Sequence, residues 1–249
     1  MDNTNLLLFL FFIIFILISG MIFYFTPLKN WLEIKKISSI INLKKSIGLS
    51  IEHGKGLHIS LGKSNLNNIH GAASLIGINT LSKILDQSIL SDNPPVATSG
   101  SGDVTLLAQT TFQNFGKEKA GFSSTEQSNV FLSGPTNMSY IAGAIPSSSK
   151  QDLSTQVLVG NLGSEIGLLL NAGNRAGNYS LSATDNLEGQ AVSYVYSDET
   201  LIGEQIFSIP AQLDNNKIHA LSLIVHDFLR WVIIIAIIFV AFLKIIGIL

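Results

Sequence analysis

The residues best suited to chemistry are small polar residues and aspartates in short loops that follow runs of apolar residues. They are Thr98, Ser99, Gly100, Ser101, Gly102, Asp103, Gly160, Asn161, Gly163 and Asp185. Where such a loop leads into a helix, the backbone amides of the first helical turn can bind an anion. One interpretation is therefore a pocket for a small anionic ligand that resembles a nucleotide.

The same loops also suit a domain that binds no ligand. Glycine allows a tight turn between a strand and a helix, and serine or aspartate caps the helix that follows. Gly160, Gly163 and Gly167 depart from the spacing of the dinucleotide fingerprint, and no lysine or arginine accompanies them. This second interpretation is the simpler one, and it predicts no cofactor.

Other motifs in the sequence do not specify a reaction. Gly62, Lys63 and Ser64 look like the end of a phosphate-binding P-loop, but Leu57 occupies the position where that motif requires glycine. The chain has no cysteine, which excludes thiol catalysis, and it has no G-x-S-x-G turn for a hydrolase serine.

Four neighbouring residues, Glu52, His53, His58 and His70, could be imagined around a metal ion. Neither an H-x-x-x-H nor an H-x-E pattern fixes their geometry, so solvated or hydrogen-bonded histidines are the better interpretation. Acidic residues in the loops could act as general acids or bases only if they lined a common cleft. We therefore predict no catalytic residue and no metal site, and we favour a protein that is not an enzyme.

The elements that would position these loops alternate through the middle of the chain. Short runs typical of strands occur at residues 57–61, 96–98, 130–132, 156–159, 179–183 and 200–202. Helical patterns follow most of them, at residues 69–90, 104–119, 136–144, 163–172 and 187–196. This repeated unit of strand, turn and helix predicts an α/β domain with one mainly parallel, doubly wound, Rossmann-like sheet.

Two apolar segments have the length of membrane spans. Residues 6–25 form a run of twenty without a charge, and residues 231–249 are apolar except for Lys244 and Gly247. At about 1.5 Å per residue, each segment reaches across a hydrocarbon core of about 30 Å. We therefore expect transmembrane helices within residues 1–27 and 228–249, on either side of an α/β domain at 48–227.

Basic residues gather on one side of both predicted spans. The positive-inside rule then places the α/β domain in the cytoplasm, both termini outside, and the protein in the cell (inner or plasma) membrane. Residues 28–47 predict a basic amphipathic helix, which either lies on anionic lipid or simply extends the span. The membrane-surface residues are Lys29, Lys35, Lys36, Lys44, Lys45 and Arg230.

The predicted domain carries few charges, and acids outnumber bases. Residues 48–227 contain fifteen acids and eight bases, about half the charged share of a typical soluble domain. An acidic domain disfavours nucleic acid as a partner. The scarcity of charge favours large protein contacts, so we expect a membrane-anchored, non-enzymatic assembly or scaffold protein that self-associates or joins a larger membrane complex. The alternative is a membrane-tethered receptor or enzyme that binds a small anionic ligand at the loops.

Five segments of the chain look familiar when taken together. They are GLHISLG at 56–62, SDNPPVAT at 91–98, QVLVGNLGSEIG at 156–167, LIGEQIF at 201–207 and DFLRW at 227–231. As a set they resemble an uncharacterised family of prokaryotic two-span membrane proteins that carries a domain of unknown function. The resemblance covers most of the chain from about residue 48 onward. It implies the fold and topology expected above, and it brings no activity or catalytic residue.

Overall fold

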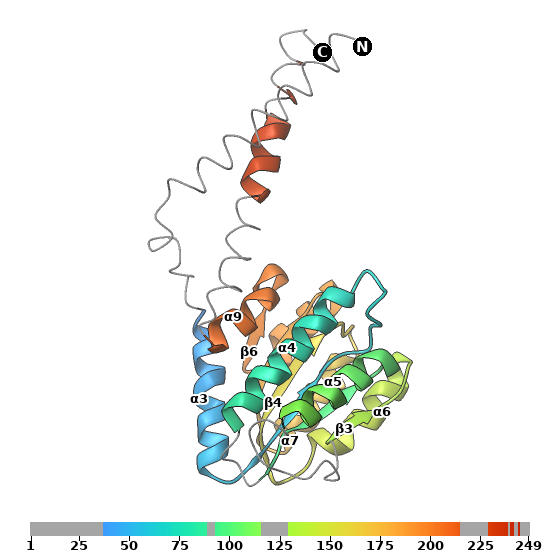
Figure 1. Cartoon of the computed structure of the whole chain (residues 1–249), viewed down its shortest axis with the longest axis vertical. Helices are drawn as coiled ribbons and strands as arrows, with labels where there is room; N and C mark the ends of the chain where they lie inside the picture. Colours follow the sequence, from blue (N-terminus) through green and yellow to red (C-terminus); the bar gives the residue numbers. More distant parts are fainter. Residues whose placement is uncertain are drawn as a thin grey trace. The chain divides into compact units, whose positions relative to one another are not determined.

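The computed structural model divides the chain into two compact units, each described here by itself. The first is an α/β domain, described over residues 37–88, 93–115 and 129–214. The second unit comprises both ends of the chain, of which residues 229–238, 240, 241 and 244 are described. Figure 1 shows the α/β domain, whose strands and helices position the loops singled out in the sequence.

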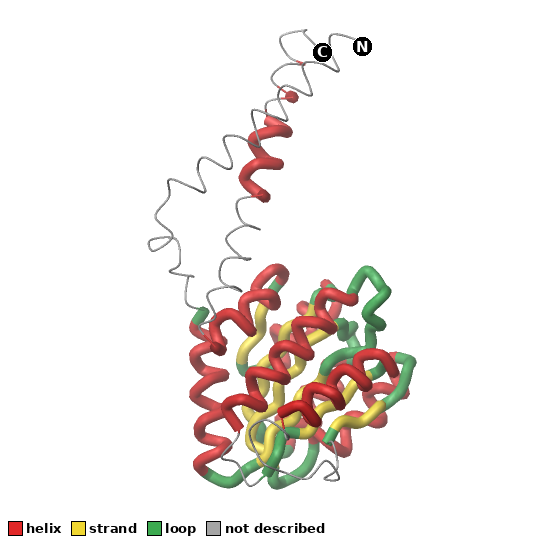
Figure 2. The backbone as a smooth tube through the Cα atoms, in the orientation of Figure 1, coloured by secondary structure: helices red, strands yellow, loops and turns green. Residues whose placement is uncertain are grey.

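One six-stranded sheet forms the centre of the α/β domain (Figure 2). The strands stand in the order β3-β2-β1-β4-β5-β6, and every neighbouring pair is parallel. This order is consistent with a doubly wound, Rossmann-like sheet, so the predicted α/β fold with a parallel sheet is confirmed. The strands are β1 (Gly56–Ser60), β2 (Val96–Ser99), β3 (Val130–Leu132), β4 (Leu153–Gly160), β5 (Tyr179–Thr184) and β6 (Glu199–Leu201).

Helices cover both faces of the sheet. Figure 1 shows α4 and α5 lying across one face. Helices α3 and α9 also pack on this face, and α6, α7 and α8 cover the other. The helices are α3 (Ser38–Glu52), α4 (Gly71–Gln87), α5 (Gly102–Phe115), α6 (Asn137–Ser148), α7 (Ile166–Arg175), α8 (Leu187–Tyr196) and α9 (Ile209–Asp214), with a 3-10 helix, η3 (Gly203–Ser208), before α9.

Strand β1 shows how the alternation of residues divides the two faces. Because successive side chains of a strand point to opposite faces, Leu57 and Ile59 join the main core beneath α3 and α4. His58 and Ser60 point to the opposite face, where both bond to other polar side chains. A smaller apolar cluster around Tyr140 of α6 completes that second face. The two layers of helices therefore rest on chemically different surfaces.

Helix α3 packs into the α/β domain. Its side chains Ile40, Leu43 and Ile47 are buried in the main core, whereas Lys44 and Lys45 are exposed on its outer side. The domain boundary that we expected at residue 48 therefore lies within α3. Part of the basic helix expected at residues 28–47 is thus a core-facing helix of the domain. Lys29, Lys35 and Lys36 lie outside the described residues.

The first and last helices of the α/β domain lie side by side. Helix α3 packs against α9, and the backbone amide of Ile37 donates a hydrogen bond to Oε1 of Gln212 at 3.1 Å. The chain therefore enters and leaves the domain at neighbouring points.

In the part of the chain that the structure describes, no helix has the length and apolar character needed to cross a membrane. Residues 229–238 are helical, and Arg230 lies within them. The first predicted span, at residues 6–25, falls outside the described residues, and so do residues 239, 242, 243 and 245–249 of the second, at 231–249. Both spans stay predictions.

Candidate functional site

The loops after β1 and β4 meet where a doubly wound sheet usually binds its ligand. These two strands are neighbours at the centre of the sheet, and their connections run to opposite faces. A crevice for a ligand normally opens at this switch point, outside the carboxyl ends of the strands. Here the loop after β1 supplies Lys63, and the loop after β4 leads to Glu165.

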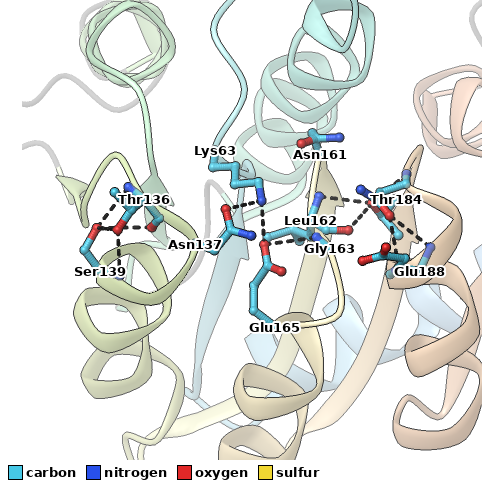
Figure 3. Close-up of polar contacts among 12 residues, drawn as sticks. Lys63, Thr136, Asn137, Ser139, Asn161, Leu162, Gly163, Glu165, Thr184 and Glu188 are labelled. Atoms are coloured by element: carbon cyan, nitrogen blue, oxygen red, sulfur yellow. Dashed lines mark hydrogen bonds and ion pairs between the residues drawn. The ribbon is translucent and has the colours of Figure 1, made fainter.

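An ion pair joins these two loops across the switch point. The Lys63 ammonium donates a hydrogen bond to Oε1 of Glu165 at 2.8 Å and another to the side-chain oxygen of Asn137. Figure 3 shows the lysine amine held between these two acceptors, which lie at the start of α6 and directly before α7. The side chain of Lys63 is 17% exposed and that of Glu165 only 3%, so the pair is largely shielded from water.

Glu165 is held as a carboxylate by its surroundings. Burial alone would raise its pKa, but the hydrogen bond from Lys63 and those from the amides of Glu165 and Gly163 outweigh burial and lower the pKa below its ordinary value. The Gly163 amide donates to Oε1 at 3.1 Å. The same carboxylate therefore closes its own loop and binds the lysine opposite.

A second polar contact joins the loops after β4 and β5. Asp185 accepts a hydrogen bond from Nδ1 of His70 at 2.6 Å through one oxygen and from the side-chain amide of Asn161 at 2.8 Å through the other. His70 stands directly before α4. Both oxygens of Asp185 are thus bound by the protein's own side chains.

The loop after β2 is bound in the same way. Helix α5 begins at Gly102, so Asp103 lies in its first turn and not directly before the helix, as the range expected at 104–119 would have it. Its carboxylate accepts hydrogen bonds from the amides of Leu66, at 2.7 Å, and Val104, at 2.9 Å. Partial burial opposes ionisation, yet these bonds outweigh it and lower the pKa of Asp103. The hydroxyl of Ser101 donates to the backbone oxygen of Ser64.

Glycines let the loops approach one another without a gap. A Cβ atom on Gly100 would lie 2.7 Å from the Cα atom of Lys63, and one on Gly160 would lie 2.3 Å from the backbone oxygen of Leu61. Gly62 adopts a φ of 75°, which a side chain would strain. These glycines therefore allow the loops to pack closely. This agrees with the simpler interpretation of the sequence, in which the glycines serve the fold and not a ligand.

Two helices beside the switch point are capped by their own side chains. Thr136 and Ser139 form a reciprocal capping box at the start of α6, and Oδ1 of Asn186 accepts from the amides of Glu188 and Gly189 at the start of α8. Figure 3 shows the Thr136 and Ser139 contacts. Because these amides already have acceptors, fewer free N–H groups remain at the starts of α6 and α8 to bind an anion than at the start of an uncapped helix.

Thr98, at the end of the strand expected at residues 96–98, and Ser99, expected in the loop after it, were both candidates for ligand binding. Both lie in β2 and are buried. The Thr98 hydroxyl lies 3.1 Å from Nε2 of His58, on the face of the sheet that α6 covers. These two residues therefore contribute to packing within the sheet.

His58 is fully buried and not solvated. Burial, assisted by the positive charge of Lys150, lowers its pKa to about 3, so the imidazole is neutral at physiological pH. Among the described residues, no group of three or more His, Cys, Asp or Glu side chains could hold a metal ion. His58 and His70 contact different partners in different parts of the domain.

Sequence reasoning missed the two side chains that tie the central loops together, Lys63 and Asn137. The statement that no basic residue accompanies the glycine loops is wrong, because Lys63 reaches the loop after β4. The available signal was the position of Gly62, Lys63 and Ser64 directly after a strand. The segment does not match the P-loop pattern, which requires glycine where this chain has Leu57, but its lysine still lies where the loops meet.

As a chemical site, the loops at the carboxyl ends of the strands form a polar seam, in which charged side chains bond to one another or to backbone amides. It contains the carboxylates of Asp103, Glu165 and Asp185, each already bound by protein donors, and the single ammonium of Lys63 is bound to one of them. An anion would meet more negative than positive charge among these four groups. The arrangement therefore fits a seam that holds the loops in place.

The whole chain, residues 1–249, matches the model of one family, which is described as a domain of unknown function (DUF6754). No curated protein and no solved structure matches the chain. The family match confirms the expected resemblance to a family that carries a domain of unknown function. The prokaryotic origin and the two membrane spans of that resemblance stay predictions.

Proposed function

The chain belongs to the family defined by this domain, and we propose that it is a membrane-anchored, non-enzymatic assembly protein. Residues 6–25 and 231–249 would span the cell membrane, with both termini outside and the α/β domain in the cytoplasm. The surface of the domain would then bind copies of itself or another subunit of a membrane complex. In this role the domain needs a stable surface and no reactive group.

The observation that carries this proposal is where the domain exposes its apolar side chains. The switch point is filled by the pair of Lys63 and Glu165, whereas Leu187, Tyr194 and Val195 on helix α8 are 80%, 74% and 76% exposed. Exposed apolar side chains grouped on one element are typical of contacts with another protein. The domain therefore offers a contact surface in preference to a ligand pocket.

The geometry at the ends of the domain supports a double anchor. The chain enters at Ile37 and leaves near Gln212, and a hydrogen bond joins these two residues. Helical residues 229–238 also expose large apolar side chains on several sides, among them Trp231, Ile233 and Ile237, as a lipid-facing helix does.

Two measurements on the full-length chain test this proposal. Light scattering coupled to gel filtration in mild detergent should give a mass of more than one copy, and a clean monomer without a partner would contradict assembly. Because the chain has no cysteine, single cysteines introduced at exposed Lys44 and next to the ends can report topology through labelling in sealed vesicles. Labelling of Lys44→Cys from the extracellular side would contradict the cytoplasmic placement.

A second candidate function, binding of a small anionic ligand, rests on Lys63. Its ammonium lies at the switch point and would have to leave Glu165 to meet a phosphate group. If such a site exists, ADP or inorganic phosphate should raise the melting temperature, and Glu165→Gln should increase the rise while Lys63→Met abolishes it. We expect no rise with either probe, because the lysine already has its counter-ion.

A further inference from the structure

Apolar side chains are exposed at one end of the α/β domain. They follow the carboxyl ends of β1, β5 and β6, and they are Ile69, Leu187, Ile202 and Phe207. We call these four residues the carboxyl-end rim. Ile69 is 94% exposed, so the domain itself gives this side chain almost no cover. Exposed apolar side chains that gather in one region are typical of a surface that contacts a protein or a membrane.

The opposite end of the domain exposes charged side chains. In the described loops that precede the strands, no large apolar side chain is exposed. The charged residues exposed in these loops are Lys55, Lys150, Asp152 and Asp198. A partner that covers the domain from the carboxyl end of the sheet would therefore leave this charged end in water.

The polar seam holds Ile69 in its exposed position. Three carboxylates, which follow β2, β4 and β5, all bind the loop after β1, in which Ile69 lies. The pairs are Asp103 with the amide of Leu66, Glu165 with Lys63, and Asp185 with His70. Because the loop is fixed before any contact forms, little order has to be imposed on it by a partner. Because these charges already have protein partners, covering them leaves none of them unpaired.

The bond between His70 and Asp185 also joins two parts of the rim. Nδ1 of His70 lies 2.6 Å from a carboxylate oxygen of Asp185. Ile69 directly precedes the histidine, and Leu187 stands two residues after the aspartate, at the first position of α8. Ile69 and Leu187 are therefore held on neighbouring loops. The exposed apolar residues in the second half of α8 remain available for the protein contact of the proposed function.

The rim also lies on the segment through which the chain leaves the domain. Ile202 and Phe207 belong to the turn that leads into α9, and α9 packs against α3, through which the chain enters. Residues 26–36 join the first predicted span to Ile37, and even fully extended they reach at most about 40 Å. With residues 6–25 in the bilayer, this short connection keeps the domain close to the lipid surface.

We propose that the carboxyl-end rim rests on the bilayer and inserts its apolar side chains among the lipid headgroups. This inference rests on the proposed membrane anchoring and names lipid as the partner of this surface. Removal of the apolar side chains from water favours the contact. Glu188 and Glu204 lie beside the rim and are exposed, so a strongly anionic lipid surface would repel it. The contact therefore depends on apolar insertion and not on charge.

The absence of cysteine from the chain allows a direct test. Ile69→Cys in the full-length protein is labelled with a fluorophore and reconstituted in phosphatidylcholine vesicles, in which some lipids carry a nitroxide quencher near the headgroup. The label should be quenched at least threefold more than in the matched control, Lys150→Cys, because Lys150 is exposed in a loop at the opposite end. Equal quenching at the two positions would overturn the contact with lipid.

Leu187→Asp in the Ile69→Cys background tests whether the rim acts as one surface. The added charge should reduce the quenching at least twofold without lowering the melting temperature, because Leu187 is 80% exposed and aspartate is favourable in the first turn of a helix. Unchanged quenching would contradict a contact that includes Leu187. Replacement of part of the phosphatidylcholine by phosphatidylglycerol should not increase the quenching, and an increase would contradict a contact made by apolar insertion.

Flotation of the same vesicles after an alkaline wash separates this inference from the proposed function. If the protein floats with the vesicles but position 69 is quenched no more than position 150, the rim contact is wrong and the anchoring stands. Protection of position 69 from thiol labelling in native membranes but not in these vesicles would then assign the rim to a protein subunit. If the protein does not float with the vesicles, both are wrong.

Discussion

The two faces of the sheet are both buried, yet they are made of different residues. Under α3 and α4 the strands contribute Leu57, Ile59 and Val157, whereas under α6 and α7 they contribute His58 and Gln156, among others. Parallel sheets are usually apolar on both faces. In this domain burial of apolar surface stabilises one layer, and specific hydrogen bonds orient the other.

The polar face also carries an energetic cost. Within the part of the chain that the structure describes, Nδ1 of His58 and Oε1 of Gln156 are buried and have no hydrogen-bond partner in the protein. A buried polar atom without a partner costs about 1–3 kcal/mol. The same layer of helices includes α8, on which Leu187, Tyr194 and Val195 are exposed. The face under α3 and α4 therefore stabilises the domain, whereas the face under α6 and α7 supports the helices that expose apolar side chains.

The largest effect should come from the apolar face. Ile59→Ala removes a fully buried side chain from the main core and leaves a cavity, so we expect the free energy of unfolding to fall by about 2–5 kcal/mol. Urea unfolding of the full-length chain in mild detergent, followed by circular dichroism, measures this loss. A loss below about 1 kcal/mol would mean that this face does not dominate stability.

The polar face should make stability depend on pH through His58. Burial lowers the pKa of His58 to about 3 in the folded protein, whereas the unfolded chain takes up a proton below about pH 6.5. The contribution of the neutral imidazole is complete above pH 6.5 and is lost as the pH falls toward 3. Between pH 7 and pH 5 we expect a loss of about 2 kcal/mol in unfolding free energy.

The variant His58→Gln is the control for this pH dependence. Its amide can replace Nε2 opposite Thr98 but does not titrate. Urea unfolding at pH 7, 6 and 5 should show a flatter profile for this variant than for the wild-type protein. Parallel profiles for the two proteins would assign the dependence to other groups.

The smallest effect should come from Ser60→Ala, one residue from Ile59 and on the opposite face. The Ser60 hydroxyl bonds to the Tyr140 hydroxyl, which also lies 3.4 Å from both oxygens of Thr98. Because Tyr140 keeps these contacts, we expect a loss of about 1 kcal/mol in the same urea experiment. A loss equal to that of Ile59→Ala would remove the distinction between the two faces.

The fold could be predicted because its signals are local. Strand β3 and helix α8 were expected at the residues where the structure has them, since a short apolar run and a helical period are each visible within ten residues. Helix α3 was harder to assign, because its lysines resemble a membrane-surface pattern. The burial of Leu43 and Ile47 depends on strands far away in the sequence.

The site could be predicted only in part, because its contacts are not local. Asp185 and Asn161 were both candidates, and the structure brings them together. The bond from Lys63 to Glu165 joins residues about a hundred positions apart, and no rule of sequence spacing predicts such a pair. The burial of polar side chains under α6 and α7 was also not predicted from the sequence, because a serine or histidine in a strand normally indicates contact with water.

Native mass spectrometry of the full-length chain, extracted gently from its own membrane, tests the central claim most directly. It reports the number of copies, any protein partner and any small molecule retained by the domain. We predict a spectrum with two or more copies and no nucleotide-sized additional mass. A monomer that carries such a mass, and loses it when Lys63 is replaced by methionine, would contradict the account. It would assign the function to the loops at the carboxyl ends of the strands.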